Sequence, residues 1–167
     1  GYKHNCQTCT MAYELRRRGF NIEASGNPVL KGYKQYRAFS KFCSDNGVKW
    51  NDRYLTSDGK RADYVYSRGI RDTDDTKLKF IEDKTSEQGR YEVYCSWKRG
   101  GAHVFIVEKQ KDGNLLWYDP QTGRRGDASN FNDDYVKNMD ANKIGILRID
   151  DKLINPKFAT RLLKASK

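Results

Sequence analysis

The sequence predicts an α+β fold, with helices concentrated in the first half of the chain and an antiparallel sheet in the second. Two patterns support this prediction. In the first half, apolar residues recur at intervals of three and four, which is the period of a helix with one buried face. In the second half, apolar and polar residues alternate between turn signals, as they do in half-buried strands. Because the chain of 167 residues contains no repeat, low-complexity tract or evident linker, we expect one domain over residues 1–167.

The chain opens with a predicted helix and a short strand. Residues 6–18 are predicted to be helical as far as Gly19, which favours a helix end. Asn5 precedes this helix and is suited to cap it, because its side-chain oxygen can accept a backbone N–H of the first turn. Residues 20–24 alternate and predict a short strand, and a turn follows at residues 25–28.

A second helix is predicted over residues 33–45, because its aromatic residues and one cysteine fall on one face. That face consists of Tyr33, Tyr36, Phe39, Phe42 and Cys43. Residues 44–76 are polar and have no clear period, and residues 77–88 are expected to contain a short helix.

The second half predicts four strands and a final helix. The strands are residues 90–97, 103–108, 115–118 and 144–149. Asp112-Gly113 is a strong hairpin signal between the second and third of these strands, and Gly100-Gly101 marks the turn before the second. The last helix is predicted over residues 156–165.

The chain is strongly basic, with 32 Lys and Arg residues against 22 Asp and Glu residues and a net charge of +10. This balance favours contact with nucleic acid, an anionic membrane or an acidic protein, although solubility alone also explains it. No apolar run is long enough to span a membrane, so no transmembrane segment is expected. Because the first residue is Gly1 rather than Met, we expect a processed product or a piece, such as the C-terminal part, of a larger protein.

Four cysteines, Cys6, Cys9, Cys43 and Cys95, are too few for a disulfide-stapled scaffold of this length. Cys43 and Cys95 lie in apolar stretches and are expected to be buried. Cys6 and Cys9 have the spacing of a zinc-ligand pair, which Cys43, Cys95 or His103 would have to complete, but no second close pair is present. A thioredoxin-like redox site would need a strand before Cys6. We therefore favour neither a metal site nor a redox site.

Cys6 is the candidate nucleophile. At the start of a helix, the unpaired backbone N–H groups and the helix dipole favour a thiolate over a thiol. The thiolate is the nucleophilic form, and the same N–H groups can hold an oxyanion. Cys9, one turn further along, is the alternative nucleophile, and a purely structural role is the alternative for either cysteine.

His103 is the candidate general base. The only other histidine, His4, lies close to the start of the chain, where we expect it to be loosely held. If the hairpin after His103 pairs in register, Asp119 lies near the start of the same strand and can accept the second ring N–H of His103. The amide of Gln121 can donate to an oxyanion or bind a substrate amide. Taken singly these residues indicate an ordinary strand and turn, but together with Cys6 they have the order of a Cys-His-Asp hydrolase.

Three blocks of the chain resemble papain-fold toxin domains, which occur at the C-termini of bacterial polymorphic toxins and in some phage-encoded proteins. These blocks are Asn5-Cys6-Gln7-x-Cys9 with Ala12 to Gly19, Gly100 to Glu108, and Trp117 to Gly123. Residues 25–88 and the tail beyond residue 125 carry no such resemblance.

The resemblance implies a papain-like fold, in which an N-terminal helix bearing the nucleophilic Cys6 packs on an antiparallel sheet bearing His103 and Asp119. His103 would act as general base and then as general acid, and Asp119 would orient it. Papain-like enzymes often use a glutamine several residues before the cysteine to hold the oxyanion. None of the five residues before Cys6 is a glutamine, so either Asn5 or Gln121 takes that part, or the excised fragment has lost the group.

The resemblance further implies a cysteine-dependent amide hydrolase, either a glutamine deamidase or a peptidase, that acts on a protein of a host or rival cell. Such a reaction needs no metal or organic cofactor. Deamidation, proteolysis and acyl transfer share a thioester step, so the sequence does not separate them. We expect an acidic protein target for this basic chain, an immunity protein or carrier domain as a further partner, and secretion or delivery into a target cell as part of a larger bacterial or phage protein.

The alternative function is a basic nucleic-acid-binding or zinc-binding module without catalysis. Tyr33-Lys34-Gln35-Tyr36-Arg37 interleaves aromatic and basic residues, as proteins that bind single strands do. No established nucleic-acid-binding signature accompanies it, and its aromatic spacing is that of a helix face. Nucleic-acid binding is therefore not favoured.

Overall fold

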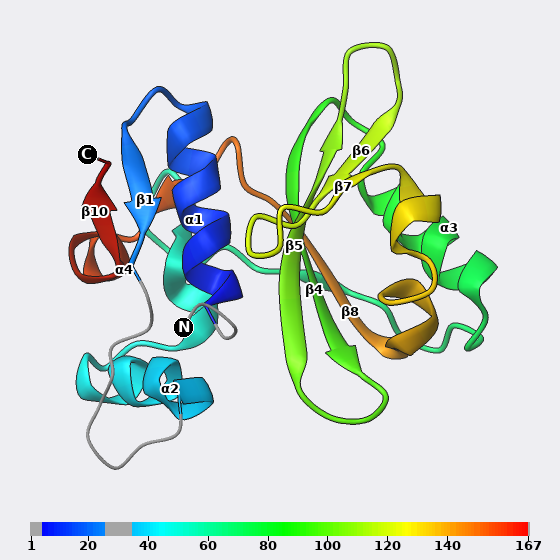
Figure 1. The fold of residues 1–167 in the computed structure, drawn as a ribbon, viewed down its shortest axis with the longest axis horizontal. Helices are drawn as coiled ribbons and strands as arrows, with labels where there is room; N and C mark the ends of the chain where they lie inside the picture. Colours follow the sequence, from blue (N-terminus) through cyan, green and yellow to red (C-terminus); the bar gives the residue numbers. More distant parts are fainter. Residues whose placement is uncertain (1–4, 26–34, 167) are drawn as a thin grey trace. The chain divides into compact units, whose positions relative to one another are not determined.

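The computed structural model describes residues 5–25 and 35–166. The chain divides into two compact units. The first comprises the chain up to Ala62 together with the segment from Asp151 on, and the second comprises Asp63–Asp150. Figure 1 shows the elements in chain order. The expected single domain stays a prediction.

The first unit combines helices with two small antiparallel sheets, each of two strands. Its elements are α1 (Cys6–Arg17), β1 (Ile22–Ala24), α2 (Gln35–Asp45), the 3₁₀ helix η1 (Trp50–Arg53), β2 (Tyr54–Leu55), β9 (Leu153–Ile154), α4 (Pro156–Leu162) and β10 (Leu163–Ala165). One sheet pairs β1 with β10, and the other pairs β2 with β9. Each sheet therefore joins an early part of the chain to its last part.

Helix α1 confirms the prediction for residues 6–18 to within one residue. Met11 and Ala12 are buried, as the helical spacing requires. The helix ends before Gly19, whose φ of +92° is a left-handed conformation that glycine adopts without strain. Cys6 is the first residue of this helix, so the sequence pattern placed the candidate nucleophile correctly.

An aromatic cluster joins α2 to α4. Phe39 and Phe42 of α2 and Phe158 of α4 are buried, with ring centroids 5.6 to 6.2 Å apart. Cys43 is also buried, so the predicted apolar face of the second helix is confirmed for its described members. Two further members of that face lie outside the described side chains: Tyr33 and Tyr36.

The second unit is built on a six-stranded antiparallel sheet with the order β3-β8-β4-β5-β6-β7. The strands are β3 (Val65–Tyr66), β4 (Gly89–Trp97), β5 (Ala102–Lys109), β6 (Leu115–Tyr118), β7 (Arg125–Gly126) and β8 (Met139–Arg148). Helix α3 (Asp74–Lys84) and the 3₁₀ helices η2 (Ala128–Phe131) and η3 (Val136–Asn138) cover one face of this sheet (Figure 1).

The core of the second unit lies between the sheet and these helices. Alternate residues of β4 point into it, as the sequence pattern predicts, and they are Tyr91, Val93 and Cys95. Phe105 of β5 stacks on Trp117 of β6, with ring centroids 5.4 Å apart, and both side chains are fully buried. Aromatic rings bury large areas, so this cluster provides much of the hydrophobic stabilisation of the unit.

Several boundaries differ from the predictions. Helix α3 begins before the predicted residue 77, because the Thr73 side chain accepts the N–H of Thr76 and so caps the helix. Helix α4 ends before the predicted residue 165, because the residues that follow it pair with β1. Strands β2 and β3 lie within residues 44–76, whose polar composition gave no strand signal.

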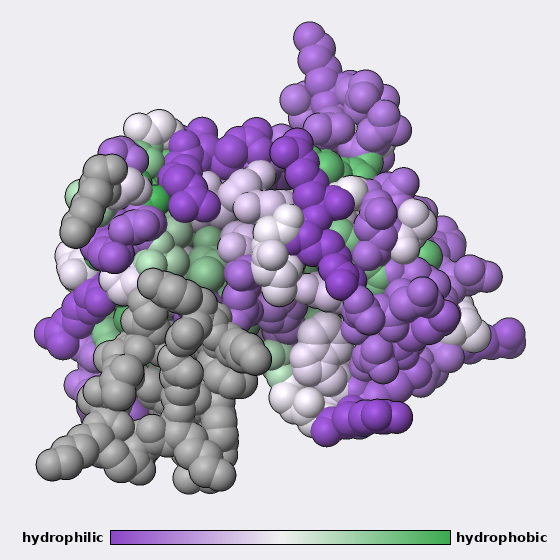
Figure 2. All heavy atoms as spheres, viewed as in Figure 1, coloured by the Kyte–Doolittle hydropathy of each residue, from purple (hydrophilic) through white to green (hydrophobic). Residues whose placement is uncertain are grey.

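The predicted α+β class is confirmed, since an N-terminal helix bears Cys6 and the sheets are antiparallel. Within the described part of the chain, no helix is both long and apolar enough to cross a membrane. Polar and charged residues cover most of the face drawn in Figure 2, and hydrophobic residues reach it in small separate areas.

Replacing Ile81, which is fully buried on α3, with Ala is expected to lower the free energy of unfolding by about 2–5 kcal/mol, because the lost atoms leave a cavity. Lys79→Ala on the same helix is the matched control. It removes an exposed ion pair with Asp83, which contributes about 0.5 kcal/mol or less. Urea denaturation followed by circular dichroism measures both changes. Equal effects of the two substitutions would contradict the packing of α3 on the sheet.

Candidate active site

The second unit brings His103 and Asp119 together. His103 lies near the start of β5, and Asp119 directly follows β6. The two strands pair antiparallel, with Ile106 opposite Tyr118, so Asp119 falls beside the first part of β5. His103 Nε2 lies 2.9 Å from Asp119 Oδ2. The contact expected from the hairpin register is therefore present.

Asp119 is fully buried and accepts hydrogen bonds at both carboxylate oxygens. His103 and the Tyr135 hydroxyl both contact Oδ2. The backbone N–H of Gln121 donates to Oδ1 over 2.8 Å. A buried carboxylate is costly unless such donors replace its water, so this arrangement stabilises the charged form.

The pKa of Asp119 reflects two opposing effects. Burial alone would raise it, but the hydrogen bond and charge of His103, together with the Tyr135 hydroxyl and the Gln121 amide, hold the pKa below the ordinary value. The pKa of Tyr135 is raised, first by burial and then by the adjacent carboxylate, so the phenol keeps its proton and donates it. Asp119 is therefore ionised at neutral pH.

An ionised carboxylate only accepts hydrogen bonds, so the tautomer of His103 can be inferred. Nε2 must carry the proton that points to Asp119, which makes Nδ1 the ring nitrogen able to take a proton from a nucleophile. The His103 ring stacks on Trp97 with centroids 6.0 Å apart and meets the Tyr135 ring at 75°. Its side chain is 12% exposed, so the imidazole is held by packing but still accessible.

The first unit carries Cys6 at the start of α1. Cys6 is buried, and its thiol lies 3.3 Å from the side-chain oxygen of Gln7. The first turn of any helix has N–H groups without partners inside the helix, and these groups favour a negative charge on a nearby sulfur. Cys9 lies deeper in the helix and is half-buried.

Asn5 occupies the N-cap position of α1 as predicted, but its side chain accepts no backbone N–H of the first turn, so the predicted capping bond is wrong. Its amide Nδ2 instead donates to the carbonyl of Ser25 over 3.3 Å. The side chain thus ties the start of the helix to the residue after β1. Asn5 and Cys6 belong to the first unit, whereas His103, Asp119 and Gln121 belong to the second. His4 lies outside the described residues.

Two residues near these groups carried no sequence signal. Arg53 is fully buried in the first unit and donates to the carbonyl of Gln7 (3.1 Å) and the hydroxyl of Thr10 (3.2 Å). These two hydrogen bonds therefore hold the first turns of α1 in place. Tyr135, the other residue, reaches Asp119 from a segment with no regular pattern.

The remaining cysteines lie in different surroundings. All four are free thiols. Burial raises the pKa of Cys43 to about 11, despite an opposing effect of Arg53, and this disfavours a reactive thiolate. Cys95 is fully buried in the core of the second unit. Across residues 5–25 and 35–166, no three His, Cys, Asp or Glu side chains are grouped as metal ligands.

The lowered pKa of Asp119 predicts a specific pH dependence of stability. A carboxyl group whose folded pKa is depressed stabilises the fold above the unfolded value of about 3.9, and this contribution disappears as pH falls through the folded pKa. Asp119→Asn should therefore lower the free energy of unfolding by about 1–3 kcal/mol at pH 6, and the difference from wild type should shrink between pH 5 and 3.

Urea denaturation at a series of pH values measures this difference, with the exposed Asp83→Asn as the control in the same unit. A difference between wild type and Asp119→Asn that stays constant down to pH 3 would contradict the assignment of Asp119 as a stabilised carboxylate.

Comparison with known proteins places most of the chain in one family. A sequence model of the family Papain fold toxin 1, glutamine deamidase, matches residues 4–124, a range that includes Cys6, His103 and Asp119. No curated protein matches the sequence. The family match spans more than half of the chain, and the α+β architecture with a cysteine on its first helix is consistent with a papain-like fold. The chain therefore belongs to the papain-fold toxin family of glutamine deamidases.

Proposed function

We propose that the protein is a cysteine-dependent deamidase that converts glutamine side chains of a protein target to glutamate, with Cys6 as nucleophile, His103 as base and acid, and Asp119 as the orienting group. The observation that carries this proposal is the buried His103–Asp119 pair, in a chain that belongs to a deamidase family. A buried, ionised carboxylate on one ring nitrogen prepares the other for proton transfer. The family match favours this function over a non-catalytic nucleic-acid-binding or zinc-binding module.

In the first half of the reaction, the Cys6 sulfur attacks the side-chain carbonyl carbon of glutamine while its proton passes to Nδ1 of His103. The tetrahedral intermediate collapses when the C–N bond breaks, and His103 returns the proton to the departing ammonia. A thioester between Cys6 and the substrate side chain remains. Asp119 stabilises the imidazolium that forms between these two proton transfers, through the hydrogen bond at Nε2.

In the second half, water attacks the thioester carbonyl and gives a proton to Nδ1 of His103. The C–S bond breaks, the sulfur regains its proton from His103, and the product is a glutamate side chain. The overall reaction adds one water and releases one ammonia, and it requires no group beyond those of this chain.

The negative oxygen formed in both halves needs donors. The backbone N–H groups at the start of α1 are the first candidates, because helix geometry leaves the first ones without a partner inside the helix. Asn5 donates one amide N–H to Ser25 and would have to supply this role with the other. The side-chain amide of Gln121 is the second candidate, because Gln121 already contacts Asp119 through its backbone.

The charge and the family suggest the biological setting. A net charge of +10 favours an acidic protein target through long-range attraction. Because the family is one of toxins, we propose that this domain acts on a protein of another cell and is delivered as part of a larger bacterial or phage protein. An immunity protein or a carrier domain would then be its further partner.

If Cys6 and His103 act as a pair, Cys6 is expected to react with iodoacetamide at least ten times faster than Cys43 and Cys95, because a thiolate is the reacting form. His103→Ala should slow Cys6 to the rate of the buried thiols, whereas Cys9→Ala should leave Cys6 unaffected. Mass spectrometry of digests after timed labelling gives the rate of each cysteine. Equal, slow labelling of all four cysteines would argue against the pair.

The reaction itself is tested with a blocked glutaminyl-glycine dipeptide and with unfolded casein as substrates. We expect release of ammonia without cleavage of the peptide chain, and a loss of about a thousandfold or more in Cys6→Ala. Chain cleavage instead of ammonia release would assign the protein as a peptidase. Ammonia release that persists in Cys6→Ala would contradict the proposed mechanism.

A further inference from the structure

Tyr135 lies beyond the residues matched by the family model, yet it contacts both members of the His103–Asp119 pair. Its hydroxyl donates to Asp119 Oδ2, the same oxygen that His103 Nε2 contacts. Its ring meets the His103 ring edge-on, with centroids 5.7 Å apart. One side chain therefore touches the carboxylate and the imidazole together.

The Tyr135 ring is fixed by the aromatic core. It packs edge-on against Phe131 (4.9 Å between centroids), Phe105 (5.6 Å) and Trp97 (5.7 Å). The Arg124 guanidinium lies over the ring, 5.3 Å from its centroid. A ring packed on several sides has little freedom to rotate, so its hydroxyl has a defined position.

The backbone beside Tyr135 is also anchored. Lys77, fully buried on α3, donates to the carbonyl of Val136 over 3.0 Å and pairs with Asp72 at 2.7 Å. Asp72 also pairs with Lys98, and the backbone N–H of Lys98 donates to the carbonyl of Asn138 over 2.9 Å.

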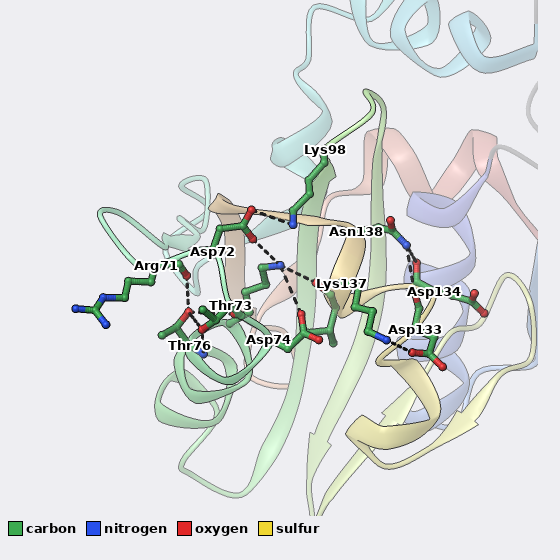
Figure 3. A network of polar contacts seen from close by, with 12 residues as sticks. Arg71, Asp72, Thr73, Asp74, Thr76, Lys98, Asp133, Asp134, Lys137 and Asn138 are labelled. Atoms are coloured by element: carbon green, nitrogen blue, oxygen red, sulfur yellow. Dashed lines mark hydrogen bonds and ion pairs between the residues drawn. The ribbon is translucent and has the colours of Figure 1, made fainter.

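Figure 3 shows this network together with Asn138, whose side-chain amide donates to the carbonyls of Asp133 and Asp134. These contacts hold the chain on both sides of Tyr135. Helix α3 and the turn after β4 thus support the segment that delivers the Tyr135 hydroxyl to Asp119.

We propose that Tyr135 is a positioning residue that orients the Asp119 carboxylate and thereby keeps His103 in the tautomer with its proton on Nε2. A carboxylate can rotate about its bond to Cβ, and two donors on Oδ2 with one on Oδ1 define a single rotation. Loss of the tyrosine hydroxyl removes one of the donors on Oδ2, so the carboxylate is less firmly directed at Nε2. The consequence for catalysis rests on the function proposed above, but the effect on the His103 tautomer does not.

The test compares Tyr135→Phe with Tyr91→Phe. Tyr91 is a matched control, because it lies in the same core and its hydroxyl donates to a different acceptor, the carbonyl of Glu87, over 2.8 Å. Nitrogen-15 NMR reports the tautomer of neutral His103, and His4→Gln leaves it as the only histidine. We expect the Nε2–H tautomer in wild type and Tyr91→Phe, and a mixture of both tautomers in Tyr135→Phe. A pure Nε2–H tautomer in folded Tyr135→Phe would overturn the proposal.

A measurement on the wild-type protein keeps the proposal falsifiable if Tyr135→Phe fails to fold. The Tyr135 hydroxyl proton is expected as a slowly exchanging resonance with a nuclear Overhauser effect to the Nε2–H of His103, because both protons point at one oxygen. Absence of that effect would contradict the arrangement on which the proposal depends.

The rate of Cys6 alkylation by iodoacetamide separates this proposal from the proposed function. Tyr135→Phe alone is expected to slow alkylation of Cys6 about tenfold. Added to Asp119→Ala, the same substitution should not slow alkylation further, since Tyr135 acts through Asp119. If labelling depends on His103 but the tautomer is unchanged in Tyr135→Phe, the role of Tyr135 is wrong and the function stands. If the tautomer changes but Cys6 labelling ignores His103→Ala, the proposed function is wrong and the role of Tyr135 stands.

Discussion

The buried carboxylate of Asp119 requires hydrogen-bond donors, and this requirement constrains how the segments of the second unit can pack. A charge without water needs donors, and this one receives them from three separate parts of the chain: His103 on β5, the backbone after β6, and Tyr135 between η2 and η3. Phe105 and Phe131 pack against the Tyr135 ring and so help to fix the position of its hydroxyl. The stability of this unit and the orientation of His103 therefore depend on the same hydrogen bonds.

The first unit holds Cys6 through contacts of its own. Cys6 is the first residue of α1, and the buried Arg53 donates to the carbonyl of the neighbouring Gln7. Asn5 ties the helix start to Ser25. Each unit thus holds one of the two groups of the proposed mechanism through hydrogen bonds to its surroundings, and nucleophilic catalysis requires such positioning.

Local signals predicted most of this arrangement, and long-range contacts account for what they missed. The helix at residues 6–18 and the hairpin with Asp112-Gly113 follow from spacing and turn residues, and the hairpin register alone placed Asp119 beside His103. Tyr135 and Arg53 could not be found in this way. Each lies in a segment without periodicity and makes its hydrogen bond to a residue that is distant in the sequence. From its neighbours in the sequence alone, Tyr135 looks like an ordinary core tyrosine and Arg53 like an ordinary surface arginine.

In the proposed mechanism, the imidazole of His103, oriented by Asp119, takes the proton of the Cys6 thiol. The most direct measurement uses 1,3-dibromoacetone, a short reagent whose two ends alkylate a thiol and an imidazole that lie within its reach. Mass spectrometry of the digested protein should find Cys6 and His103 joined by the three-carbon bridge, with the link at Nδ1 and no such product in His103→Ala. Cys6 carrying the reagent as a single adduct, or bridged to a different residue, would contradict the account.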